Sequence, residues 1–176
     1  MIDLSQDYFA LFGLPRRYRI DSTALDEAYR SLQSAVHPDR FVNADETERR
    51  LSMQSSARVN EAYRTLRDPV DRAQYLLSLQ GIDAPPESDN ALPFEFLEEQ
   101  LERREAVEQA QATSDDATLE ALLAEVRHDI HERDAALAEV LDDEQDWESA
   151  RASVRELRFL HRLAADVDRA AAELDQ

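Results

Sequence analysis

The sequence contains no cysteine and no lysine, and only two of its 176 residues are glycine. Without cysteine the chain forms no disulfide, thiolate metal site or cysteine nucleophile, and it holds no iron–sulfur cluster through its own thiolates. Because it has so little glycine and only six prolines, a sheet fold with many tight turns is disfavoured. Composition therefore predicts an all-α fold. Since a signal peptide and long apolar runs are also missing, we expect a cytoplasmic protein that does not enter a membrane.

Acidic residues greatly outnumber basic ones, and the formal net charge is −19. Residues 1–80 hold 11 Arg and 12 acidic residues, a net charge of −1, whereas residues 81–176 hold 9 and 27, a net charge of −18. Such acidity disfavours nucleic acid and anionic membranes as partners, because both carry negative phosphate groups. It favours a protein partner with a basic surface.

The first 80 residues predict an antiparallel helical hairpin with a short helix on either side. Four helices are expected: one around residues 7–12, one after a plausible N-cap at Asp21-Ser22, one over about 45–66 and one over 70–79. Apolar residues mark one face of the second helix, at Leu25, Tyr29, Leu32 and Val36. That helix must end near Val36, because Pro38 lacks an N–H and pushes His37 out of the α region. The chain therefore turns at His37-Pro38-Asp39.

The remaining residues predict a short linker and a three-helix bundle. The linker covers residues 81–92, which include Pro85-Pro86. Three long helices are expected over residues 93–112, 115–141 and 146–174, with Asp142-Asp143-Glu144 as a polar turn. We therefore divide the chain into domains at residues 1–80 and 93–176.

The turn and its flanking helices resemble a J-domain in order and spacing. The matching segments are Tyr29-Arg30-x-Leu32, His37-Pro38-Asp39-Arg40-Phe41, Asn60-Glu61-Ala62-Tyr63-x-x-Leu66 and Asp68-Pro69-x-x-Arg72-Ala73-x-Tyr75-Leu76. The resemblance implies that the loop docks on a DnaK-class chaperone and stimulates its ATP hydrolysis, while the J-domain binds no nucleotide. The chaperone-binding residues it implies are His37, Pro38, Asp39, Arg40 and Arg30.

The second helix is less basic than is usual in J-domains. Arg30 is offset there by Asp26 and Glu27. Arginines outside that helix are candidates to compensate, namely Arg16, Arg17, Arg19 and Arg40. Because exposed charge pairs are weak and screened by salt, the difference concerns affinity for the chaperone.

Nearly the whole chain resembles the HscB/Jac-type iron–sulfur J-domain co-chaperones. The segments that carry this resemblance are Tyr8-Phe9-Ala10-Leu11-Phe12-Gly13-Leu14-Pro15, Arg72-Ala73-x-Tyr75-Leu76-Leu77-Ser78-Leu79, Phe96-Leu97-x-Glu99-Gln100-Leu101-Glu102-x-Arg104-Glu105 and Leu157-Arg158-Phe159-Leu160. The family delivers an IscU-type iron–sulfur scaffold to an HscA-type chaperone. The resemblance implies scaffold-binding residues at Leu97, Leu101, Glu102, Glu105 and Phe159. Glu98 stands where the family often has an apolar residue.

The residues themselves also favour a docking surface on the first bundle helix. At 100° per residue, Phe96, Val107 and Ala110 share one face, whereas Leu97 and Leu101 lie nearly opposite. That second stripe is fringed by carboxylates, which suits an apolar patch bordered by Lys or Arg. The alternative is that neighbouring helices bury both stripes. On the last helix an apolar stripe is expected at Trp147, Ala150, Val154, Leu157 and Ala164. Phe159 lies off this stripe among arginines, which also predicts a contact.

No enzyme active site or cofactor site is identifiable, so we predict a monomeric regulator of a partner's ATPase. His128 and His131, with Glu132 adjacent, are more typical of an exposed helix face than of a metal site. Two alternatives remain. One is a general J-domain co-chaperone for another client, and the other is an acidic helical adaptor or coiled-coil module that self-associates.

Overall fold

The computed structural model describes residues 3, 5–41, 44–82 and 92–174. The chain forms two compact units, Met1–Leu79 and Gln80–Gln176, each of which is described by itself. As predicted, the fold is all-α: the described residues form helices and no strand. Most of the expected linker lies outside the described residues. Among those residues we find no helix long and apolar enough to cross a membrane.

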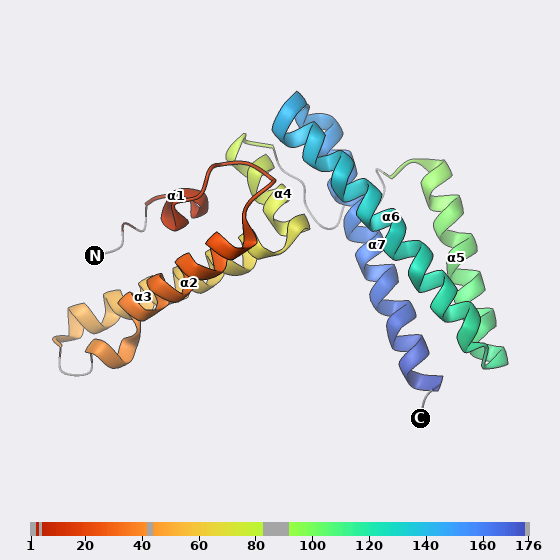
Figure 1. Cartoon of the computed structure of the whole chain (residues 1–176), viewed down its shortest axis with the longest axis horizontal. Helices are drawn as coiled ribbons and strands as arrows, with labels where there is room; N and C mark the ends of the chain where they lie inside the picture. The colour runs from red at the N-terminus through yellow and green to blue at the C-terminus, as the bar shows by residue number, and fades with distance from the viewer. Residues whose placement is uncertain (1–2, 4, 42–43, 83–91, 175–176) are drawn as a thin grey trace. The chain divides into compact units, whose positions relative to one another are not determined.

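The first unit is built on a helical hairpin. Its elements are α1 (Tyr8–Phe12), α2 (Ser22–Val36), the 3-10 turn η1 (Pro38–Phe41), α3 (Glu46–Arg67) and α4 (Pro69–Leu79). Helices α2 and α3 lie side by side and antiparallel, and η1 lies at the end of the hairpin away from α4 (Figure 1). Aspartates cap the first three α-helices by accepting hydrogen bonds from exposed N–H groups, at Asp7, Asp21 and Asp45.

Aromatic residues join the short helices of this unit to the hairpin. The rings of Tyr8 in α1 and Tyr75 in α4 stack with centroids 4.3 Å apart, and the Tyr75 hydroxyl accepts a hydrogen bond from the Tyr8 N–H at 3.0 Å. Beneath them the core is apolar and closely packed, with Phe9, Tyr18 and Leu25 almost fully buried. This core fixes the hairpin and therefore the turn at its far end.

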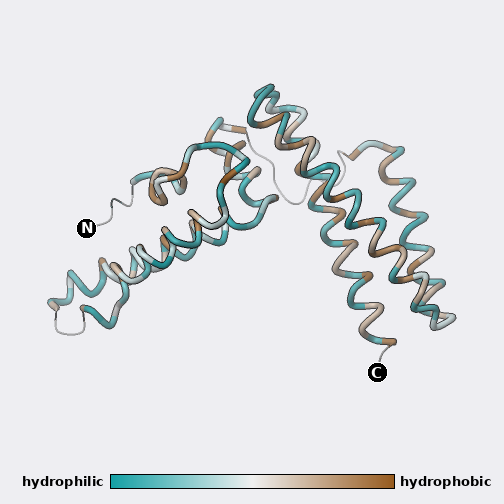
Figure 2. The backbone as a smooth tube through the Cα atoms, viewed as in Figure 1, coloured by the Kyte–Doolittle hydropathy of each residue, from teal (hydrophilic) through white to brown (hydrophobic). Residues whose placement is uncertain are grey.

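The second unit is a three-helix bundle. Its elements are α5 (Phe94–Thr113), α6 (Asp116–Glu139), the π-helical turn η3 (Val140–Glu144) and α7 (Trp147–Leu174). The most extensive contact joins α6 to α7, and α5 packs against both helices less extensively. Figure 2 shows apolar segments recurring along each of these helices between polar ones.

The connection between α6 and α7 differs from the polar turn expected at Asp142-Asp143-Glu144. The helix continues into η3 because Leu141 is buried, and the chain reverses only at Gln145, which has a positive φ of 55°. The π-helical turn η3 holds about one residue more per turn than an α-helix. This keeps Leu141 in the core while the acidic side chains that follow stay outside it. The sequence placed the reversal a few residues too early.

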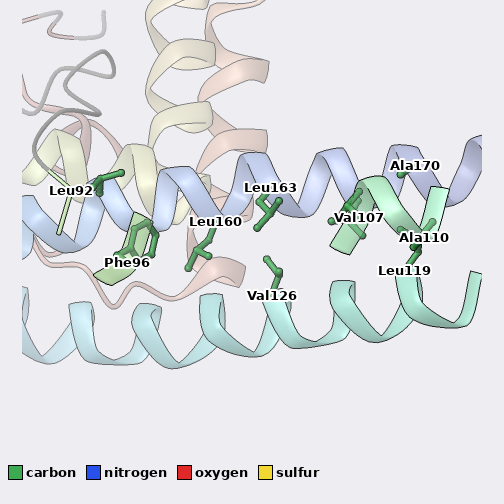
Figure 3. Packing of buried hydrophobic residues seen from close by; sticks show 10 residues of the cluster. Leu92, Phe96, Val107, Ala110, Leu119, Val126, Leu160, Leu163 and Ala170 are labelled. Atoms are coloured by element: carbon green, nitrogen blue, oxygen red, sulfur yellow. The ribbon is translucent and has the colours of Figure 1, made fainter. Parts of the chain in front are cut away.

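The bundle core extends over the full length of α5. Figure 3 shows Val107 and Ala110 near Leu119 and Ala170 at one end of the bundle, and Phe96 near Leu92 and Leu160 at the other. On α7 the buried stripe is longer than the sequence indicated. Its members are Ala150, Val154, Leu157, Leu160, Leu163, Val167 and Ala170. Trp147 and Ala164, which were expected on it, are only partly buried.

Candidate functional site

The turn of the first unit is closed by its own backbone. His37 leaves the helix with φ −59° and ψ 127°, as expected for a residue that precedes a proline. Its carbonyl then accepts a hydrogen bond from the Arg40 N–H at 3.0 Å, which closes η1. The turn is therefore fixed by local chemistry.

His37 and Asp39 are held together on the outside of this turn. The Asp39 N–H donates to Nδ1 of His37 at 3.3 Å, and Oδ2 of Asp39 lies 3.6 Å from the same nitrogen. Because Nδ1 accepts this hydrogen bond, the neutral ring carries its proton on Nε2. Both residues are exposed. The turn therefore presents an imidazole and a carboxylate to the solvent.

Two side chains attach the turn to the hairpin. An Nη atom of Arg40 donates to the carbonyl of Ser34 at 3.1 Å, and the buried hydroxyl of Ser52 donates to the carbonyl of Val36 at 2.8 Å. Both carbonyls belong to the last turn of α2, where helical partners are missing. Sequence reasoning missed Ser52, although its position on the inner face of α3 was a usable signal.

Charged residues of the weakly basic second helix and the arginines expected to compensate for it differ in their surroundings. Arg30 is exposed on α2, and Asp26 in that helix accepts a hydrogen bond from the Tyr63 hydroxyl at 2.7 Å. That hydrogen bond raises the pKa of Tyr63. Arg16 pairs with Asp7 at 2.6 Å, and Arg40 binds the end of α2. Arg16 and Arg40 therefore already stabilise the fold of the first unit.

In the second unit, the two apolar stripes of α5 have different environments. Phe96, Val107 and Ala110 are buried, as expected. Leu97 is 38% exposed and Leu101 is 57% exposed, which rules out the alternative that neighbouring helices bury both stripes. The predicted flanking carboxylates, Glu102 and Glu105, are exposed as well. The outer face of α5 is thus an apolar strip bordered by negative charge.

Phe159 is less open than its off-stripe position suggested. It is partly buried, with its ring edge-on to Phe96 at a centroid distance of 5.7 Å and an interplanar angle of 80°. The guanidinium carbons of Arg104 and Arg162 lie 5.1 and 5.9 Å from its ring centroid. Part of the contact that the sequence predicted for Phe159 is therefore made within the bundle. Helix α5 supplies it through Phe96 and Arg104.

Sequence reasoning missed two buried polar residues on the inner face of α5. Gln100 is 1% exposed and Arg103 is 7% exposed. One Nη atom of Arg103 lies 2.6 Å from Asp129 and 2.8 Å from Glu125, both on α6, and 2.9 Å from Glu99. Burial alone would lower the pKa of Arg103, but these carboxylates raise it, so the guanidinium stays charged.

A signal for this cluster was present in the sequence. Phe96, Gln100, Arg103 and Val107 follow helical spacing, and Glu125 and Asp129 are four residues apart on the next helix. The helical spacing of apolar residues predicts that polar residues face the solvent. It therefore does not identify a buried arginine that is paired with carboxylates.

Sequence reasoning also missed Phe94, the first residue of α5, which is 76% exposed.

His128, on α6, lies 3.5 Å from Glu132, and both side chains are largely exposed. Among the residues that the structure describes, no group of three potential ligands is arranged to hold a metal ion.

Comparisons with known proteins match both units. The DnaJ domain model matches residues 7–75, and the model described as the HSCB C-terminal oligomerisation domain matches residues 92–168. A co-chaperone protein HscB homolog from an Azoarcus species is 49% identical over 174 residues, which cover 99% of this chain and 98% of the relative.

Solved structures agree with these matches. The chaperone HscB from Vibrio cholerae has a TM-score of 0.88 and 38% identity, over 96% of this chain and 99% of that chain. The human co-chaperone protein HscB has a TM-score of 0.89 and 30% identity, over 94% and 82% of the two chains. The hairpin with its His37-Pro38-Asp39 turn and the bundle that follows place this chain in the HscB family of J-domain co-chaperones.

Proposed function

We propose that this co-chaperone binds an IscU-type iron–sulfur scaffold through its bundle, delivers it to an HscA-type chaperone and stimulates that chaperone's ATPase through the His37-Pro38-Asp39 loop. The observation that carries the proposal is the pairing of two exposed features in one chain. One is the His37–Asp39 turn of a J-domain, and the other is the Leu97–Leu101 strip of an HscB-type bundle.

The loop acts as a docking device and not as a catalyst. An exposed imidazole donor beside a fixed carboxylate suits directional contacts with a partner surface. Arg40 adds positive charge at the turn, and Arg30 adds it about two helical turns earlier on α2. Pro38 limits the conformations that the free loop must give up on binding. In this role the chain regulates hydrolysis that takes place on the partner.

The strip on α5 selects the client. Leu97 and Leu101 supply apolar area, and Glu102 and Glu105 supply the charged border that an apolar patch with Lys or Arg around it would match. Phe159 contributes its remaining exposed surface and supports Phe96 beneath the strip. We assign residues 1–80 to the J-domain, 81–92 to a linker and 93–176 to the client-binding domain of a cytoplasmic protein.

The test combines both partners in one assay. The purified chain is mixed with an HscA-type chaperone, with and without an IscU-type scaffold, and ATP hydrolysis and scaffold binding are measured in parallel. We expect binding of the scaffold at a ratio of one to one and a faster ATPase when both proteins are present. A scaffold that does not bind, or equal stimulation with an unrelated client, would favour a general J-domain co-chaperone.

A second candidate is a self-associating helical module, which the match of residues 92–168 to the HSCB C-terminal oligomerisation domain favours. The two candidates differ in mass in solution. We expect size-exclusion chromatography with light scattering to give a monomer of about the chain mass, 20.1 kDa, across the concentration range of the binding assay. A mass that rises with concentration would support self-association instead.

A further inference from the structure

Exposed large apolar side chains are concentrated on the first two turns of α5. Four such residues stand out in the described chain, namely Met53 at 64%, Phe94 at 76%, Leu97 at 38% and Leu101 at 57% exposed. Three of these four belong to α5, and the most exposed is an aromatic residue. Such clustering is unlike the scattered single apolar residues of an ordinary protein surface.

Phe94, Leu97 and Leu101 form one stripe. At 100° per residue the three positions fall within about 60° of one another around the helix. Phe96, by contrast, points to the inner face, where it is buried among the core residues of the bundle. Phe94 therefore extends the strip by one turn toward the start of α5 without contributing to the core.

We propose that Phe94 is a third apolar anchor for the client, an inference that rests on the proposed function of the strip. Aromatic side chains that a partner buries contribute more binding free energy than most of their neighbours, because they bury a large area with few rotatable bonds. A phenyl ring left three-quarters exposed gains little in the free chain. Its burial against a partner supplies the missing contribution.

The charges around the extended strip identify the kind of partner. Glu98 and Glu105 lie on one side of the stripe, and Arg104 lies on the other, where it meets Phe159. A partner that buries Phe94 must therefore carry an apolar patch whose basic side faces Glu98 and Glu105. The occupant is the scaffold client, which must present such a patch. A second copy of this chain is a poorer match, because two acidic bundles would repel each other.

The decisive experiment compares matched alanine variants by calorimetry with the IscU-type scaffold. Phe94→Ala should weaken binding about tenfold, as expected for one aromatic anchor. Met53→Ala removes a similarly exposed apolar side chain from α3 and should leave the dissociation constant unchanged. Phe94→Trp should retain most of the affinity, because it preserves an aromatic anchor. Thermal unfolding of each variant should match that of the unmodified chain.

Failure of this inference is distinguishable from failure of the proposed function. If Phe94→Ala binds within twofold of the unmodified chain while Leu97→Ala with Leu101→Ala binds weakly, the strip is correct and Phe94 is not an anchor. If none of these variants changes scaffold affinity, both the strip and the anchor are wrong. A change in self-association in place of scaffold affinity would assign Phe94 to contacts between copies and overturn the inference.

Discussion

The turn of the J-domain and the strip of the bundle present exposed groups in opposite ways. At the turn, hydrogen bonds fix a few polar atoms, with Ser52 and Arg40 holding the carbonyls at the end of α2. On α5, apolar side chains project from a continuous helix whose inner face is partly polar. Hydrogen-bonding groups need a rigid backbone, because their contacts depend on direction. Apolar side chains need only a helix that is correctly packed against the rest of the bundle. We therefore expect mutations to impair the two proposed functions separately.

Removing the imidazole should have the largest effect of all. His37→Gln replaces the ring with a side chain that cannot reproduce its donor geometry, so we expect stimulation of the chaperone ATPase to fall to the basal rate. Helicity by circular dichroism and affinity for the scaffold should stay unchanged, because His37 is exposed and lies in the other unit. Full stimulation by His37→Gln would remove the loop from the account.

Truncating the strip should produce the opposite pattern. We expect Leu97→Ala with Leu101→Ala and Phe159→Ala to weaken scaffold binding by about 3 kcal/mol, roughly a hundredfold, while stimulation without scaffold stays normal. Because Phe159 is partly buried, the double variant at Leu97 and Leu101 serves as a control for folding. Unchanged affinity by calorimetry in both variants would refute the surface.

Loss of the buried arginine should affect only the bundle. Arg103→Ala leaves Asp129 and Glu125 without their guanidinium, and we expect a loss of about 2 kcal/mol in the free energy of unfolding. The figure is below that of a fully buried pair because Glu125 is half-exposed. The matched control is Arg169→Ala, which removes an exposed pair with Asp166 at 3.4 Å and should cost less than about 0.5 kcal/mol.

Denaturant unfolding followed by hydrogen exchange would assign the Arg103→Ala loss to α5 and α6. Equal destabilisation by the Arg103 and Arg169 variants would show that burial of the cluster is unimportant. Arg103→Ala should also lower scaffold affinity, because it disturbs the packing of α5 in the bundle. ATPase stimulation in the absence of scaffold should not change.

The smallest expected effect is on the pH dependence of the J-domain. Burial acts to raise the pKa of Asp7, but the Ala10 N–H and the Arg16 guanidinium outweigh it, so the folded pKa is lower than the unfolded one. The resulting stability is present above the unfolded pKa of about 4 and is lost as pH falls through the lower folded pKa.

The free energy of unfolding, measured between pH 5 and pH 2, should therefore depend less steeply on pH in Asp7→Asn than in the unmodified chain. We expect the two free energies to differ by less than about 1 kcal/mol. Glu27→Gln, which removes another exposed carboxylate from the same unit, is the control for the loss of one acidic group. An unaltered slope in Asp7→Asn would show that the cap and the Arg16 pair do not stabilise the charged carboxylate.

Local chemistry made the J-domain more predictable than the bundle. Pro38 and the aspartate caps determine where helices begin and end, and the structure ends α2 at Val36 as expected. In the bundle, spacing identified the inner face of α5 but assigned only apolar residues to it. The inward Arg103 depends on carboxylates of another helix, and the partial burial of Phe159 depends on where α5 crosses α7. Neither feature can be predicted from the residues of one helix alone.

A complementation assay tests most directly whether loop and strip must act from one chain. The scaffold-dependent part of the chaperone ATPase is measured with an equimolar mixture of His37→Gln and the Leu97→Ala, Leu101→Ala, Phe159→Ala variant. One partner in this mixture has an intact strip and the other an intact loop. Because the proposed delivery would require both on the same molecule, we predict that the mixture gives no scaffold-dependent stimulation beyond that of either variant alone. Restoration of the unmodified rate would contradict the account.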